Sequence, residues 1–104
     1  MKTFKNITSE RAIGNWLKRW CEERKYRIVK LNPAQYNGLP DRLIMTDNGR
    51  CIFIEIKSKG CSLRPMQVHW LDWLKGNGHQ TLVLDEVNES TSYYLGEMIK
   101  HKYV

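Results

Sequence analysis

The chain has 104 residues, of which 41% are hydrophobic, and 17 basic residues against 11 acidic ones give a net charge of +6. This length suits one domain, covering residues 1–104, and the four Trp argue against a disordered chain. No segment approaches the ~20 apolar residues that cross a bilayer. The basic balance favours a polyanionic partner, most often nucleic acid, although charge alone does not identify one.

The cysteines indicate the compartment. Cys21, Cys51 and Cys61 are odd in number and have no C-x-x-C spacing, and the three His stand too far apart for a zinc pattern. The basic start is not followed by an apolar run of signal-peptide length. We therefore expect reduced cysteines and a soluble, cytoplasmic protein.

Helical spacing of apolar residues predicts a first helix from a cap at Thr8 or Ser9 to about Lys25. The next elements are a strand over residues 26–31, a loop over 32–40, and two strands, Arg42–Thr46 and Cys51–Lys57. A helix capped by Ser62 and ending at Gly76-Asn77-Gly78, a strand Thr81–Leu84 and a helix from Thr91 to about His101 complete the chain. The last helix is either a lid on the core or part of a dimer contact. This αβββαβα order predicts an α/β fold with a mixed sheet flanked by helices.

The turn between the second and third strands decides which residues face each other. If residues 47–49 form a three-residue hairpin loop with Gly49 in the left-handed conformation, Thr46 pairs with Arg50. Asp41 then lies directly opposite Glu55, with Cβ atoms roughly 5 Å apart. A two-residue turn would shift the register by one residue and separate the two carboxylates.

Alternation along the third strand sorts its side chains. Ile52, Ile54 and Ile56 share one face, which we expect to be core, while Glu55 and Lys57 share the other. Two close carboxylates repel, and a hard divalent ion such as Mg²⁺ relieves that repulsion with oxygen ligands. Such an ion can activate water and polarise a phosphoryl oxygen, and Lys57 would orient the water or help to deprotonate it. A Glu-x-Lys strand end alone is common, so the specificity comes from its combination with Pro40-Asp41 and the hairpin.

Three motifs together resemble a known family. Gly38-Leu39-Pro40-Asp41, then Phe53-Ile54-Glu55-Ile56-Lys57, then Leu63 and Gln67 with Trp70, resemble the PD-(D/E)XK nuclease superfamily, and within it the VRR-NUC (virus-type replication-repair nuclease) family. The short chain is similar to stand-alone phage members rather than to the large Fanconi-associated repair nucleases. The clear resemblance covers about residues 38–84.

The resemblance implies a restriction-endonuclease-like αβββαβ core that cleaves DNA with Mg²⁺ or Mn²⁺. Asp41 and Glu55 match the family's metal-binding acids, Ile56 would offer its backbone carbonyl to the metal, and Lys57 matches the catalytic lysine. Stand-alone members resemble homodimeric Holliday-junction resolvases, which implies a homodimer, branched DNA as substrate and, for a phage protein, the host cytoplasm.

Two further residues are candidates for the same site. Glu10 matches the acid that family members place on the first helix, although it could be an ordinary first-turn acid favoured by the helix dipole. Gln67 lies on the apolar side of its helix, where a buried amide needs partners. We expect a metal-associated water or Lys57 to supply them, with a plain polar core contact as the alternative.

Basic residues near the predicted site, Arg42, Lys59 and Arg64, could contact DNA phosphates. The leading hypothesis is a metal-dependent, structure-specific DNA endonuclease. The alternatives are a non-enzymatic DNA-binding module with an inactive nuclease fold, and a subunit that needs a larger partner for activity.

Overall fold

The computed structural model describes residues 6–32 and 34–100, and its elements follow the predicted αβββαβα order. The helices are α1 (Glu10–Glu23), α2 (Pro65–Gly76) and α3 (Glu89–Lys100). The strands are β1 (Arg27–Lys30), β2 (Arg42–Met45), β3 (Cys51–Ile56) and β4 (Gln80–Leu84). They form one sheet in the order β1-β2-β3-β4, in which β4 runs parallel to β3 and the other pairs are antiparallel. The expected mixed sheet is confirmed.

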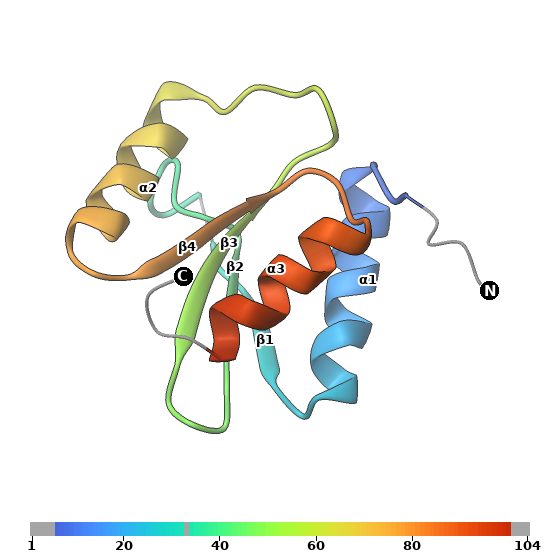
Figure 1. The fold of residues 1–104 in the computed structure, drawn as a ribbon. Coiled ribbons are helices and arrows are strands. Elements are labelled where there is room, and N and C mark those ends of the chain that lie inside the picture. The colour runs from blue at the N-terminus through green and yellow to red at the C-terminus, as the bar shows by residue number, and fades with distance from the viewer. Residues whose placement is uncertain (1–5, 33, 101–104) are drawn as a thin grey trace.

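The main core lies between the sheet and the two helices α1 and α3, which cover one face in Figure 1, while α2 covers the other. The three isoleucines of β3 are fully or almost fully buried in this core, as their alternation predicted. Helix α3 contributes Leu95, Met98 and Ile99. It therefore acts as the lid that the sequence offered as one of two interpretations. Tyr93 and Tyr94 on the same helix remain exposed.

Two helix starts differ from the prediction because another local signal sets them. Helix α2 begins at Pro65, not after Ser62, because proline suits the first helical position and holds the preceding Arg64 in an extended conformation. Helix α3 begins at Glu89 rather than Thr91, because the side chains of Asn88 and Thr91 each accept a hydrogen bond from the other's backbone N–H. Its expected last residue, His101, lies outside the described residues. Ser9 caps α1, accepting from the N–H of Ala12.

Candidate functional site

The β2–β3 hairpin sets the geometry of the candidate site. Arg42 pairs with Ile54, so one residue further back Asp41 faces Glu55 across the two strands. The Thr46 N–H donates to the Arg50 carbonyl at 2.9 Å, and Gly49 has φ +84°. The three-residue loop and its register are therefore confirmed.

Asp41 is held by contacts to two other segments of the chain and to its neighbour Arg42. Its Oδ1 accepts a hydrogen bond from the backbone N–H of Ile56 at 3.2 Å. Its Oδ2 forms an ion pair with Arg42 Nη1 at 2.8 Å, and its backbone carbonyl accepts from the N–H of Leu31 at 2.9 Å. The carboxylate is thus positioned at the end of β3, the strand that carries Glu55 and continues into Lys57.

Glu55 is the buried carboxyl of the site, and the charges of the other site residues act on its pKa. Its side chain lies on the face of the sheet that α2 covers, and the residue is only 5% exposed. Burial, followed by the charge of Asp41 and a smaller effect of Glu10, raises the pKa of Glu55 from 4.5 to about 7. The charges of Lys57 and Arg64 lower this pKa. The fold therefore brings these predicted site residues within electrostatic reach of one buried carboxyl.

Gln67 connects Glu55 to the start of α2. Its Oε1 accepts from the backbone N–H of Arg64 at 2.8 Å, and its Nε2 donates to Glu55 Oε2 at 3.2 Å. This orientation of the amide is the one in which both partners have matching polarity. The buried amide was expected to find a metal-associated water or Lys57 as partner. The structure gives it two partners that were not predicted, Glu55 itself and the N–H of Arg64, so Gln67 is placed to orient the carboxylate.

A glycine allows α2 to approach this closely. Gly38 has φ +89°, and a Cβ atom built there would lie 2.4 Å from the backbone carbonyl oxygen of Met66. Only glycine fits both the conformation and the contact. Gly38 opens the segment that leads to Asp41, and Met66 precedes Gln67, so this contact sets the distance between the two halves of the site. The sequence signal was the Gly38-Leu39-Pro40-Asp41 motif, but the packing role of Gly38 was not predicted from it.

Glu10 and Lys57 both act on the pKa of Glu55 through their charges. The N–H of Glu10, at the first turn of α1, donates to Ser58 Oγ at 3.0 Å, which ties the helix to the segment after β3. The Lys57 N–H donates to the Leu84 carbonyl at 3.1 Å and its side chain is half-buried. Over residues 6–32 and 34–100, no three Asp, Glu, His or Cys side chains are grouped closely enough to hold a metal. The charge of Glu10 reaches Glu55 and raises the pKa of that carboxyl. Ser58 was not predicted, and its sequence context offers no signal for this contact.

The donor atoms fit a hard divalent cation better than a softer one. Asp41 and Glu55 supply carboxylate oxygens, and Ile56, between Glu55 and Lys57, carries the backbone carbonyl that could complete the set. Mg²⁺ is commonly held by one or two carboxylates, with substrate phosphate and water completing its coordination. A cation beside Glu55 would also offset the cost of ionising a buried carboxyl whose pKa lies at about 7.

The three basic residues predicted to contact DNA lie in different surroundings. Arg42 is half-buried and paired with Asp41, whereas Arg64 is exposed at the start of α2. Lys59 Nζ lies 2.9 Å from Glu86 Oε1, which partly neutralises its charge and lowers the pKa of Glu86. The three do not form one continuous patch of unpaired charge.

Comparisons with known proteins agree with this architecture. The family model of the VRR-NUC domain matches residues 3–87. A solved structure described as a VRR_NUC domain superposes with a TM-score of 0.70 at 22% identity, covering 93% of this chain and all of that one. Over 54 residues the chain is 41% identical to "Putative nuclease p44" of Acyrthosiphon pisum secondary endosymbiont phage 1. That match takes in 52% of this chain and 58% of the relative, so the chain spans little more than half of the relative's length.

These findings define the class of protein as an α/β domain with two facing carboxylates at the end of a mixed sheet. The chain belongs to the VRR-NUC domain family. None of the helices in the described part of the chain is long and apolar enough to span a membrane.

Proposed function

We propose that this chain is a metal-dependent DNA endonuclease that hydrolyses phosphodiester bonds. Its catalytic centre is formed by Asp41, Glu55 and Lys57. The observation that carries the proposal is the buried Glu55, which faces Asp41 across the hairpin and has a pKa raised to about 7. Membership in the VRR-NUC family and the similarity to the phage protein named as a nuclease support it. Mg²⁺ or Mn²⁺ would be held by the two carboxylates and the Ile56 carbonyl.

Each residue of the proposed centre has a role that follows from its position. When bound, the ion supplies Lewis-acid polarisation of the phosphate and of the attacking water. Lys57, two residues after Glu55 on the same strand face, orients or helps to deprotonate that water and offsets charge developing on the phosphate. Gln67 fixes the Glu55 carboxylate through its 3.2 Å hydrogen bond, so its role is to position a ligand. Glu10 adjusts the charge balance from the first turn of α1.

We also propose the type of DNA that the chain cleaves and its oligomeric state. The net charge of +6 favours DNA, and the expected homodimer would place two centres about a two-fold axis for cleavage of branched DNA such as a four-way junction. The exposed Tyr93 and Tyr94 on α3 leave apolar surface for such an interface. The three cysteines are free, which suits action in the reducing cytoplasm of a host cell.

A cleavage assay on the purified chain tests the proposal. Labelled junction, flap and linear duplex substrates are incubated with Mg²⁺, with Mn²⁺ or with EDTA. Cleavage should require the metal and should be abolished in Asp41→Asn and Glu55→Gln. Asp72→Asn, which changes an exposed carboxylate on α2, should cleave normally and serves as the matched control.

The alternatives give different results in the same assay. A chain that binds DNA but cleaves none of the substrates in either metal is a DNA-binding module, and the proposal fails. Activity that appears only after a larger partner is added identifies a subunit of a complex. Full cleavage in EDTA, or normal cleavage by both carboxamide variants, contradicts the assigned centre.

A further inference from the structure

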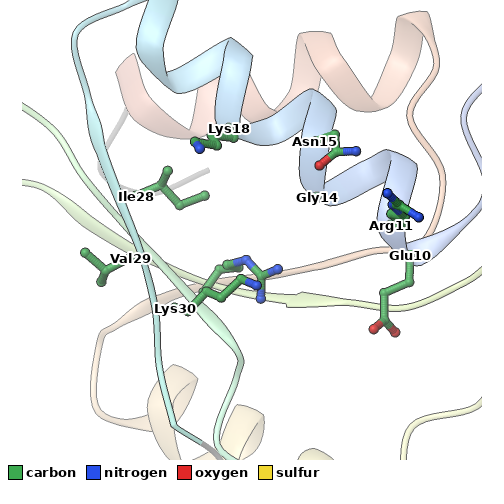
Figure 2. Close-up of a pocket in the computed structure, with 9 residues that line it drawn as sticks. Glu10, Arg11, Gly14, Asn15, Lys18, Ile28, Val29 and Lys30 are labelled. Atoms are coloured by element: carbon green, nitrogen blue, oxygen red, sulfur yellow. The ribbon is translucent and has the colours of Figure 1, made fainter.

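A groove lies between α1, the edge strand β1 and the first residue of β2 (Figure 2). Its volume is about 630 Å³. Four of its side chains are basic and one is acidic; the basic ones are Arg11, Lys18, Lys30 and Arg42, and the acidic one is Glu10. The groove therefore offers a positive channel, most of whose residues lie outside the carboxylate site.

Two basic residues of α1, Arg11 and Lys18, line this groove from one face of the helix. Arg11, Gly14, Asn15 and Lys18 follow the i, i+3, i+4, i+7 spacing that places residues on one face of a helix. The rise from Arg11 to Lys18 is about 10 Å. Along the axis of a duplex each strand rises roughly 3.4 Å per nucleotide, so this length corresponds to the axial rise of about three nucleotides.

Gly14 and Arg42 join the groove to the candidate site. A Cβ atom at Gly14 would lie 3.5 Å from Arg42 Nη2, an ordinary van der Waals contact, so the guanidinium packs directly beside α1 at this position. The Nη1 atom of the same group contacts Asp41 Oδ2 at 2.8 Å. One arginine therefore reaches from the floor of the groove to a proposed metal ligand.

Other hollows of the described surface have a different charge. The hollow between β4 and α3 is lined by Asp85 and Glu86 and by no basic residue. The hollow between α1 and α3 mixes Arg24 and Lys100 with Glu97. Of these three, the groove beside β1 is the one whose charge complements a polyanion.

We propose that this groove binds the phosphate backbone of one DNA strand over about three nucleotides beside the scissile phosphate, with Arg42 connecting the two sites. The inference rests on the proposed nuclease function and names a surface for its substrate. Arg11, Lys18 and Lys30 contact phosphates, and the absence of a side chain at Gly14 keeps the channel open. Recognition is by charge and backbone shape, so it does not depend on base sequence.

Fluorescence anisotropy with labelled DNA in EDTA measures binding separately from cleavage. The double variant Arg11→Ala/Lys18→Ala should weaken binding about 5- to 10-fold and reduce the slope of log affinity against log salt by about 2. The matched control Arg19→Ala/Lys75→Ala removes the same charge from exposed positions that do not line the groove. It should bind within about 2-fold of the wild type, because only general charge attraction is lost.

A second pair of variants tests the shape of the groove without changing charge. Gly14→Leu fills the channel while favouring the helix, and should weaken binding by a similar factor. Gly96→Leu, at a helical glycine of α3 with open space around it, is the control and should bind normally. Circular dichroism confirms that each variant is folded.

The outcomes separate this inference from the proposed function. If the wild type cleaves DNA but both groove variants bind like the wild type, the groove is not the binding surface. Equal losses in the groove and control double variants indicate general attraction, which also overturns the inference. If the wild type neither binds nor cleaves DNA, the nuclease proposal itself has failed.

Discussion

Replacing Glu55 by Gln should stabilise the protein at alkaline pH when no divalent metal is present. Burial and the neighbouring Asp41 raise the pKa of this carboxyl from 4.5 to about 7. The folded protein therefore holds the proton more tightly than the unfolded chain. As the pH rises from about 4.5 to about 7, the folded state must ionise a buried group that the unfolded chain ionises freely, and stability falls across this window.

The size of the effect follows from the pKa shift. At about 1.36 kcal/mol per pKa unit, the rise corresponds to roughly 3 kcal/mol above pH 7. Gln has nearly the same shape, and its carbonyl can still accept the hydrogen bond from Gln67 Nε2. We expect Glu55→Gln to exceed the wild type by about 2–3 kcal/mol at pH 8 in EDTA and to differ little at pH 4. A change of this size moves the melting temperature by on the order of 10 °C.

Thermal unfolding followed by circular dichroism at pH 4 and pH 8 measures this difference. Asp72→Asn removes an exposed carboxylate from α2 and should give no comparable pH-dependent gain. Adding Mg²⁺ at pH 8 should raise the melting temperature of the wild type and leave Glu55→Gln nearly unchanged, because an ion stabilises only the form that binds it. A variant that is less stable than the wild type at pH 8 in EDTA would refute the reasoning.

Three further predictions concern catalysis, packing and assembly. Lys57→Ala should slow cleavage by about 100-fold or more while Mg²⁺ affinity by calorimetry stays nearly the same; a wild-type rate would make Lys57 an ordinary strand-end charge. Gly49→Ala should cost about 1 kcal/mol, since its φ is +84° but nothing lies within 4 Å. Gly38→Ala should cost at least about 1 kcal/mol more and impair cleavage, because it must displace Met66; equal melting temperatures for the two variants would contradict this. Light scattering should give the mass of a dimer, and junctions should be cleaved faster than linear duplex; a monomer without this preference would remove the resolvase-like description while leaving the metal site intact.

Local signals in the sequence were enough for the element order. The sequence left a three-residue loop and a two-residue turn open, and the structure shows the three-residue loop ending at Gly49, whose register places Asp41 opposite Glu55. Alternation along β3 placed the isoleucines in the core, since a strand's two faces are decided by its own backbone. The predicted start of α2 was wrong although its signal is also local, because Pro65 and not the cap at Ser62 sets the first helical turn.

Only the tertiary structure decided what surrounds the carboxylates. The partners of Gln67 and the contact of Gly38 with Met66 depend on how α2 docks on the sheet. The groove beside β1 likewise requires residues from α1, β1 and β2 to meet in space. The spacing of residue types along the chain predicts the geometry of a single strand, helix or tight turn. It does not predict the docking of separate elements, and the pKa of Glu55 depends on that docking through burial and through the charge of Glu10 on α1.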